Sequence, residues 1–336
     1  MQDMMNKQIC LGRKPAGTPV AEDWILREGP LTKEGGGVLA RILYLSIDPA
    51  MQAWLTVNQP PMRPVQVGEV MRSGGLARIV ESDRPDLRPG DTVQGLVNAQ
   101  SWQRSDGRHY RKVAPGLAPL SHHLGPLGQP GMTAYFGLLE TGRLQPGETL
   151  VVSSAAGQVG HLAVQIGKIH GCRVVGIAGG PEKGAVLREQ CGVDHVIDYK
   201  RGDLRAALRE ACPDGIDVFF DNVGGDTLNA ALEQLAPRGR VVICGAVDRF
   251  FSGSTDIPRV AYLNLLRTRG TMQGLVVYDF MPRYPEAIAT MAGWLQEGRL
   301  RPLEHIRDGL ESFPALLEDL FRGTHYGKLL VRVADS

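Results

Sequence analysis

The chain of 336 residues has little that would tie it to a membrane, to a nucleic acid or to a secretory route. It contains no apolar run of about 18 residues, so we expect no membrane span. Its start has neither the basic nor the apolar segment of a signal peptide, which favours a cytoplasmic protein. A formal net charge of only +1 gives no general attraction for nucleic acids or anionic lipids, and neither is expected as a partner.

The sequence has few cysteines and no cluster of residues that could bind a metal ion together. The five cysteines are an odd number, lie far apart in the sequence and form no Cys-x-x-Cys pair, which favours reduced thiols over disulfides. A catalytic zinc needs three protein ligands and a structural zinc needs four. The neighbouring His122 and His123 are interpreted as a loop pair, because adjacent side chains rarely face one ion. We therefore expect no bound metal.

What the chain does contain is a strand, a glycine turn, a helix and a second strand between residues 147 and 183, the length of a βαβ unit. The turn, residues 155–160, reads Ala-Ala-Gly-Gln-Val-Gly and has the spacing of a dinucleotide fingerprint with Ala155 in the first glycine position. Gly157 would let the backbone approach a pyrophosphate, and Gly160 would let the helix lie close on the strand. Phosphate oxygens would then meet the N–H groups at the helix start. A purely structural glycine turn is the alternative, but the helical spacing of the following apolar residues favours nucleotide binding.

Strands alternate with helices through residues 128–294, and this predicts an α/β domain with a doubly wound parallel sheet. After a first strand that ends at Ser153, the predicted strands cover residues 172–177, 195–198, 216–221, 240–244 and 271–277. The helix before the fifth strand is expected to end at the Pro-Arg-Gly sequence of residues 237–239.

The two ends of the chain have a different pattern. Residues 1–127 look mostly β, with strands predicted near 38–47, 76–81 and 91–97 and a loop at 58–64. Residues 295–336 are predicted to return to this first domain, with a helix around 314–321 and a closing strand at 328–333.

Five motifs, in this order and spacing, resemble the zinc-independent branch of the medium-chain dehydrogenases/reductases that includes prostaglandin reductases and NADP-dependent alkenal/one oxidoreductases. They lie at residues 43–49, 131–138, 155–160, 220–225 and 274–278. The resemblance extends over nearly the whole chain. It implies a GroES-like, mostly-β substrate domain in two segments, residues 1–127 and 295–336, around a Rossmann cofactor domain of residues 128–294. It also implies NADP as the cofactor and, commonly, a homodimer.

The resemblance implies cofactor contacts residue by residue. The pyrophosphate is expected over Gly157, Gln158, Val159 and Gly160. The 2′-phosphate of the adenosine ribose is expected at Lys183 and Tyr199. Further contacts implied for NADPH are Thr133, Asn222, Cys244, Phe250, Leu275, Val276, Val277 and His325. His325 stands where the family often has an asparagine, and Phe250 stands where a tyrosine is frequent.

The residues themselves also favour NADP over NAD. An NAD site usually carries an acidic residue about twenty positions beyond the last fingerprint glycine. Here that position is Gly180, and the cation Lys183 follows, which suits a phosphate. Both residues could also lack a cofactor role. Lys183, with Glu182 beside it, could be a solvated residue in the first turn of a helix, and Tyr199 could be a surface phenol.

The reaction implied by the resemblance is hydride transfer from the nicotinamide to the β-carbon of an activated C=C bond, with charge developing on the carbonyl oxygen. The expected substrate is a small activated alkene, an α,β-unsaturated aldehyde or ketone. Tyr262 matches the tyrosine proposed to donate a hydrogen bond to that oxygen or a proton to the α-carbon. An ordinary residue of a helix at the dimer edge is the alternative for Tyr262. Met51, Trp54 and Tyr278 are candidate pocket walls, and each could simply be a core residue.

Two other functions stay open. A quinone reductase of the same superfamily would share these motifs, and the sequence Pro-Ala-Met-Gln at 49–52, where the branch often has Pro-Tyr-Met-Arg, leaves the substrate undefined. A protein that binds NADPH without catalysis is the second alternative. A methyltransferase also has a glycine turn after a strand, but the six strands in fingerprint order and Lys183 argue against it.

Overall fold

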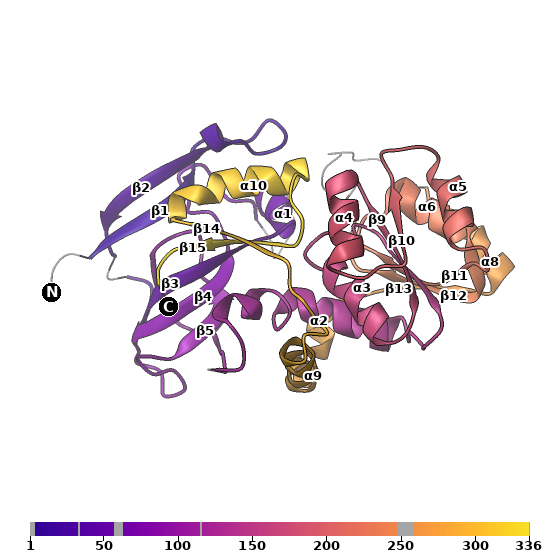
Figure 1. The fold of residues 1–336 in the computed structure, drawn as a ribbon. Coiled ribbons are helices and arrows are strands. Elements are labelled where there is room, and N and C mark those ends of the chain that lie inside the picture. Colours follow the sequence, from indigo (N-terminus) through magenta and orange to yellow (C-terminus); the bar gives the residue numbers. More distant parts are fainter. Residues whose placement is uncertain (1–3, 33, 57–62, 115, 248–258, 336) are drawn as a thin grey trace. The chain divides into compact units, whose positions relative to one another are not determined.

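The computed structural model describes residues 4–32, 34–56, 63–114, 116–247 and 259–335. The chain divides into two compact units, residues 1–124 with 304–336 and residues 125–303 (Figure 1). The boundaries expected from the sequence were 127/128 and 294/295, so the structure assigns residues 125–127 and 295–303 to the second unit.

The described residues of the first unit form a seven-stranded sheet. Its strands lie in the order β14 (Glu304–Asp308), β15 (Lys328–Arg332), β3 (Val38–Ile47), β4 (Gly74–Glu81), β5 (Thr92–Leu96) and β7 (Arg111–Lys112), and β6 (Trp102–Ser105) also pairs with β3. β14 and β15 run parallel, and the other pairs are antiparallel. The strands predicted near 38–47, 76–81 and 91–97 are confirmed. The loop expected at 58–64 falls mostly outside the described residues.

Some elements of this unit were not predicted. β1 (Met5–Leu11) and β2 (Trp24–Pro30) form a separate antiparallel hairpin, and α1 (Ala50–Thr56) closely follows β3. Most of β2 is exposed or half-exposed, so its sequence lacks the apolar alternation of a half-buried strand. The helix expected around 314–321 is confirmed as α10 (Phe313–Arg322), which buries its apolar side chains in the core of this unit.

Lys328 is an unusual part of this unit's interior, with 1% of its surface exposed. Its ammonium donates to the carbonyl oxygens of Ile47 and Leu329, at 2.7 and 3.2 Å, and pairs with the Asp48 carboxylate at 3.1 Å. Burial lowers the pKa of Lys328, and the Asp48 charge opposes that shift. Because a buried charge is tolerated only when it is paired and hydrogen-bonded, these contacts join β15 to the end of β3.

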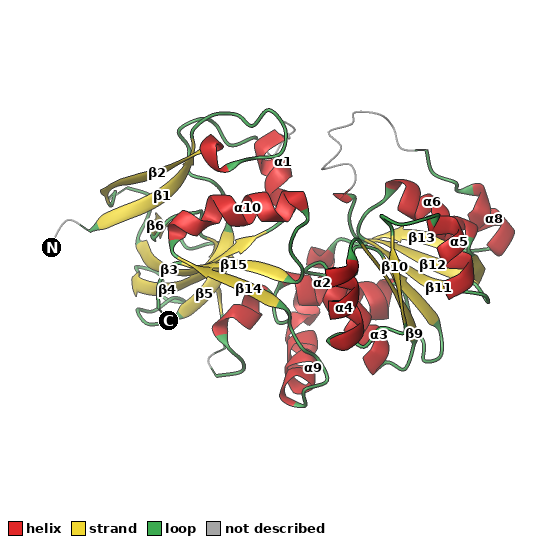
Figure 2. Cartoon of the chain, turned by 45° about the horizontal axis from the view of Figure 1, so that its top comes forward, coloured by secondary structure: helices red, strands yellow, loops and turns green. Residues whose placement is uncertain are grey.

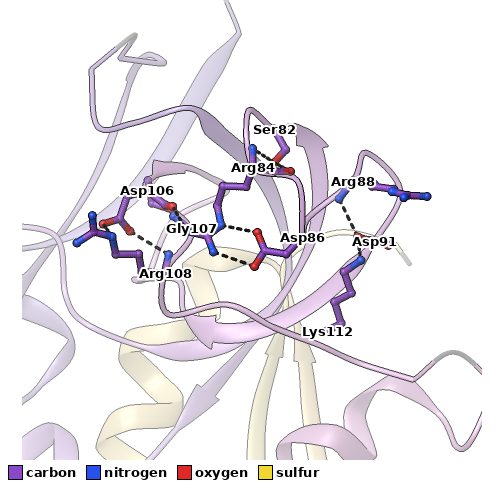
Figure 3. Close-up of polar contacts among 10 residues, drawn as sticks. Ser82, Arg84, Asp86, Arg88, Asp91, Asp106, Gly107, Arg108 and Lys112 are labelled. Carbon is purple, nitrogen blue, oxygen red and sulfur yellow. Dashed lines mark hydrogen bonds and ion pairs between the residues drawn. The ribbon is translucent and has the colours of Figure 1, made fainter.

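Exposed ion pairs hold the turns that connect the strands of this unit (Figure 3). Arg84 donates two bonds to Asp86, at 2.9 and 2.8 Å. Asp91 pairs with Lys112 at 2.7 Å and accepts the backbone N–H of Arg88 at 2.7 Å. Exposed ion pairs contribute little to stability, so we interpret these contacts as local supports for turn geometry.

The described residues of the second unit form a six-stranded parallel sheet in the order β10-β9-β8-β11-β12-β13. The strands are β8 (Thr149–Val152), β9 (Arg173–Ala178), β10 (His195–Asp198), β11 (Ile216–Asp221), β12 (Leu235–Ile243) and β13 (Thr271–Gly274). The first strand in sequence lies at the centre and later strands are added outward on both sides, which is the order of a doubly wound Rossmann sheet. Figure 2 shows helices on both faces of this sheet, and the predicted fold class is confirmed.

Among the described residues, the helices of this unit are α2 (Gln129–Phe136), α3 (Gly160–Ile169), α4 (Pro181–Glu189), α5 (Leu204–Ala211), α6 (Gly225–Glu233), α8 (Leu263–Thr268) and α9 (Tyr284–Gln296). Two of them show how the sequence starts a helix. Pro181 occupies the first turn of α4, where its missing N–H costs nothing. Asp203 caps α5 by accepting the N–H of Arg205 at 2.9 Å.

Two strand boundaries differ from the sequence prediction. β12 begins at Leu235, so residues 237–239 lie inside the strand and do not end a helix. A register shift in its pairing with β11, between Ile216 and Val218, accommodates the Pro-Arg-Gly sequence. β13 ends at Gly274, opposite the last residue of β12, and the 3-10 helix η4 (Val277–Arg283) follows it.

α3 approaches the preceding turn most closely at Gly160. A Cβ atom at this position would lie 2.2 Å from the carbonyl oxygen of Ser154 and 2.8 Å from the Cα of Ala155. Both are backbone atoms, which move aside only at the expense of the sheet geometry. Gly160 therefore allows close helix packing, but against turn residues 154 and 155, whereas the sequence suggested packing on the strand.

We expect Gly160→Ala to lower the free energy of unfolding by at least about 2 kcal/mol, because the added methyl group must displace backbone. Gly293→Ala in α9 is the matched control. No atom lies within 4 Å of its Cβ position, and alanine is favoured over glycine inside a helix by about 1 kcal/mol. Chemical denaturation measures both variants, and equal stabilities would contradict the packing described for Gly160.

Candidate functional site

The turn between β8 and α3 presents backbone donors that have no acceptor among the described residues. Ser154 has a left-handed φ of 49°, and the Gly157 N–H closes the turn on the Ser154 carbonyl at 2.9 Å. Within the described part of the chain, the N–H groups of Gln158, Val159 and Gly160 donate to no protein oxygen. These groups stand at the start of α3, where the helix dipole is positive, so the turn suits an anion such as a pyrophosphate.

The alanine in the first fingerprint position is accommodated by the neighbouring strand. Ala155 is buried, and its N–H donates to the Ile177 carbonyl of β9 at 2.9 Å. Its methyl group lies 3.0 Å from the place where a Cβ on Gly176 would be. The left-handed residue of the tight turn is Ser154, and Ala155 follows it within the same turn.

Asp221 joins three strand ends at the carboxyl-terminal side of the sheet, through its buried carboxylate and its backbone carbonyl. Asp221, the last residue of β11, accepts the Ser153 hydroxyl at 2.9 Å and the N–H groups of Val223 and Gly224 at 3.0 and 3.1 Å. Its own carbonyl accepts the N–H of Cys244 at 2.8 Å. Burial raises the pKa of Asp221, and its backbone and hydroxyl donors oppose that rise. The ends of β8, β11 and β12 are thereby held in fixed relation.

Asn222 and Cys244 belong to the same network. The side-chain amide of Asn222 donates to the Ser153 carbonyl at 2.7 Å, and its backbone N–H donates to the Ser153 hydroxyl at 2.8 Å. Burial, together with the charge of Asp221, raises the pKa of Cys244 to about 12. Its thiol therefore stays protonated near neutral pH and is suited to packing against a ligand rather than to attacking one.

At the ends of β9 and β10, the side chains of Tyr199 and Lys200 both lie over Gly179. A Cβ on Gly179 would lie 2.8 Å from the Tyr199 ring and 2.8 Å from the Cε of Lys200. Lys183 is half-buried in the first turn of α4, and burial and the nearby charge of Lys200 lower the pKa of Lys183. The structure therefore gathers Lys183, Tyr199 and Lys200 in one region. Lys200 was missed, although it directly follows Tyr199.

Asp198 fixes the two turns that carry these side chains. One of its carboxylate oxygens accepts the N–H of Gly180 and the N–H of Lys200, each at 3.0 Å. The backbone donors at Gly180 and Lys200 keep the pKa of the Asp198 carboxyl below its ordinary value. The ammonium groups of Lys183 and Lys200, on these two turns, are close enough to repel each other. Their region therefore favours binding of a doubly charged anion.

The other expected cofactor contacts are dispersed over this unit. The Thr133 hydroxyl donates to a carbonyl of its own helix, α2, at 2.7 Å. Leu275 donates its N–H to the Ile243 carbonyl at 2.9 Å and so extends the pairing of β13 by one bond. Val276 is exposed and Val277 is buried. Phe250 lies outside the described residues.

Tyr262 belongs to the second unit and His325 to the first. Tyr262 stands at the start of α8 with 64% of its surface exposed, and its phenol makes no hydrogen bond within the described ranges. His325 belongs to the first unit, where its Nδ1 lies 3.2 Å from the Asp319 carbonyl oxygen.

The candidate pocket walls have different surroundings. Met51 is fully buried in the core of the first unit, and Trp54 packs against that core. Met51 is therefore a core residue, the alternative that its sequence left open. Tyr278, in the second unit, is exposed and donates its hydroxyl to the side chain of Gln129 at 3.2 Å.

Sequence reasoning also missed His161, the residue that follows the last fingerprint glycine. Its ring is 1% exposed, with Nδ1 at 2.9 Å from the Gly157 carbonyl oxygen and Nε2 accepting the N–H of Leu303 at 3.2 Å. Burial lowers the pKa of His161 to about 4. The imidazole is therefore neutral at physiological pH.

This buried histidine predicts a pH-dependent stability. The pKa of His161 is lower in the folded chain than its ordinary value of 6.5, so its contribution is complete above pH 6.5 and is lost as the pH falls toward 4. We expect that loss to be about 3 kcal/mol. The measurement compares the free energy of unfolding of the wild type with that of His161→Asn between pH 7 and 4. The difference between the two proteins should shrink on acidification, and a constant difference would contradict the burial of this ring.

Among the described residues, no group of three or more His, Cys, Asp or Glu side chains is placed to hold a metal ion. Glu69, a carboxylate that could in principle bind a metal, is paired with Arg63 through two bonds of 2.8 and 2.9 Å. No helix in the described ranges has the length and apolar character needed to cross a membrane.

Comparisons with known proteins extend over both units. A family model described as "Zinc-binding dehydrogenase" matches residues 159–293, and one described as "N-terminal domain of oxidoreductase" matches residues 7–113. The NADPH-dependent curcumin reductase of Escherichia coli is 38% identical, over 99% of this chain and 98% of that protein. The 2-alkenal reductase (NADP(+)-dependent) of Nicotiana tabacum is 34% identical, over 99% of each chain.

Solved structures agree with this fold. The crystal structure of CurA in complex with NADPH from Vibrio vulnificus matches with a TM-score of 0.89 at 34% identity, covering 98% of this chain and 100% of that one. The doubly wound sheet and the matched families define the class as the medium-chain dehydrogenases/reductases. Within that class, the chain belongs to the zinc-independent branch of prostaglandin, alkenal and curcumin reductases, and the resemblance noted in the sequence is confirmed.

Proposed function

We propose that this protein is an NADPH-dependent reductase that transfers hydride to the C=C bond of α,β-unsaturated aldehydes and ketones without a metal ion. One observation carries the proposal. The turn at residues 157–160, with N–H groups that have no acceptor among the described residues, lies at the same carboxyl ends of the parallel strands as the two-lysine region at Lys183 and Lys200. NADPH carries a pyrophosphate and a separate 2′-phosphate, which match these two regions. The relatives described as curcumin and 2-alkenal reductases support the cofactor and the substrate class.

The described residues fit the cofactor in two chemically different ways. The N–H groups of Gln158, Val159 and Gly160 would hold the pyrophosphate through fixed backbone dipoles. Lys183 and Lys200 would hold the 2′-phosphate through full charges. Tyr199 would lie beside that phosphate, against Gly179. The further contacts that we propose for NADPH are Thr133, Asn222, Cys244, Phe250, Leu275, Val276, Val277 and His325.

Bound NADPH would supply the hydride, and the chain would hold the reactants and stabilise the charge that develops on the substrate oxygen. We assign that stabilisation to Tyr262, whose phenol can donate a hydrogen bond to an enolate oxygen; such a donor is worth about 3 kcal/mol in a transition state. We assign the first unit, residues 1–124 with 304–336, as the substrate domain.

We further propose a homodimer formed along β13. This strand pairs with β12, all four of its residues are exposed, and no described strand pairs with its other edge. Leu263 and Leu266 of the preceding helix, α8, are 66% and 78% exposed. An open strand edge beside exposed leucines is a surface that a second copy of the chain would cover. The free thiols of the five cysteines support a cytoplasmic location.

Lys183→Met and Lys200→Met should each weaken NADPH binding about 10-fold while changing NADH binding less than about 2-fold, because only NADPH carries the 2′-phosphate. Isothermal titration calorimetry with both dinucleotides measures this. Arg209→Met is the control, since it removes an exposed cation from α5 and should leave both affinities unchanged. Equal losses of affinity for NADPH and NADH would show that these lysines do not bind the 2′-phosphate.

Tyr262→Phe should lower turnover at least about 10-fold with NADPH affinity retained, because it removes one transition-state donor. The assay follows NADPH oxidation with a 2-alkenal, an enone and a quinone, and we expect the alkenal or enone to react faster than the quinone. Unchanged turnover would remove Tyr262 from the mechanism. A preference for the quinone would support the quinone reductase alternative, and NADPH binding without turnover on any of them would support a non-catalytic protein.

A further inference from the structure

We infer that His161 is a positioning residue for the phosphate-binding turn: its ring holds the Gly157 carbonyl inward and thereby directs the N–H of Gln158 outward, toward the pyrophosphate. This inference rests on the proposed binding of NADPH. It concerns a side chain that would not touch the cofactor and that lies outside the small-residue fingerprint.

The Gly157 carbonyl oxygen accepts two hydrogen bonds from one residue. The backbone N–H of His161 reaches it at 3.0 Å, as expected in a first helical turn, and the ring Nδ1 reaches it at 2.9 Å. The ring is fully buried, so water does not compete for the carbonyl. The second bond is an addition that most side chains at this position would not make.

The protein itself determines which ring nitrogen carries the proton. The N–H of Leu303 points to Nε2 at 3.2 Å, and a backbone N–H can only donate. Nε2 must therefore be the acceptor, and in a neutral ring the hydrogen is then on Nδ1, facing Gly157. The His161 ring therefore links the N–H of Leu303 to the Gly157 carbonyl of the turn.

Gln165 keeps that fixed donor in place. Its side-chain amide donates to the Arg301 carbonyl at 2.9 Å and accepts the Arg301 N–H at 2.8 Å, so the segment that ends at Leu303 is bound to α3 at two points. The same amide nitrogen also donates to the His161 carbonyl at 2.9 Å. The support for the His161 ring is therefore rigid and comes from the same helix.

The consequence for the cofactor follows from the geometry of the peptide group. In a planar trans peptide, the carbonyl of residue 157 and the N–H of residue 158 point in opposite directions. Gly157 has more freedom to rotate its peptide than any other residue would have, so the orientation of the Gln158 N–H is not fixed by the turn sequence alone. The two donors of His161 hold the Gly157 carbonyl toward the protein interior. The N–H of Gln158 is then held pointing away from the interior, where it has no acceptor within the described residues.

Two reciprocal variants separate the contacts of the ring. His161→Asn places an amide N–H where Nδ1 was and loses the contact with Leu303. His161→Gln can reach the Leu303 N–H with its carbonyl oxygen but presents no donor to Gly157. The probes are NADPH and adenosine 2′-monophosphate, which carries the 2′-phosphate and lacks the pyrophosphate. Dissociation constants come from NADPH fluorescence and from displacement of NADPH by the nucleotide.

We expect His161→Asn to keep the wild-type affinity for NADPH within about 2-fold and His161→Gln to weaken it about 10-fold. Both variants should bind adenosine 2′-monophosphate like the wild type, which also shows that they are folded. Equal NADPH affinities in the two variants, or a matching loss for adenosine 2′-monophosphate in His161→Gln, would overturn the inference and leave the proposed function intact. A wild-type protein that binds no NADPH would overturn both.

Discussion

At the carboxyl ends of the strands in the second unit, the structure depends on the buried carboxylate of Asp221. It accepts a hydroxyl from the end of β8 and backbone N–H groups from the turn after its own strand, while its carbonyl accepts an N–H from the end of β12. A buried charge of this kind is stable only when its acceptor capacity is filled. The strand ends are therefore fixed together, and the turn that follows β8 starts from a defined position.

From that position, we propose two anion sites that work by different physical means. The turn at residues 157–160 would use backbone dipoles, whose strength depends on direction, so it would rely on buried supports such as the Gly160 packing and the His161 ring. The region of Lys183 and Lys200 would use full charges, which tolerate changes of direction but repel each other while no anion is bound. NADPH would place its 2′-phosphate between the lysines and relieve their repulsion. Its pyrophosphate would at the same time accept hydrogen bonds from the backbone N–H groups of the turn.

The sequence predicted the part of this arrangement that periodicity and spacing encode. The doubly wound parallel sheet was expected from alternating strands and helices, and a close approach at Gly160 was expected from the fingerprint. It did not predict the roles of Ser153 and Asp221, because these residues meet across strands that are distant in the chain. Lys200 and His161 directly follow residues that were predicted, but the sequence does not show that Lys200 lies near Lys183 or that the N–H of Leu303 meets the His161 ring. The first strand of the hairpin, β1, and its partner β2 were missed because β2 is largely exposed and lacks apolar alternation. The expectation that β12 would begin at residue 240 failed because a register shift let Pro237 lie inside a strand.

The central claim, that backbone N–H groups at the start of α3 bind the pyrophosphate while lysines bind the 2′-phosphate, is tested most directly by amide hydrogen exchange at residue resolution. With NADPH, exchange should slow at Gln158, Val159 and Gly160 and also at the turn that carries Lys200. With adenosine 2′-monophosphate, it should slow only at the latter turn. NADPH that protects neither region, or that protects residues 158–160 no more than adenosine 2′-monophosphate does, would contradict this account.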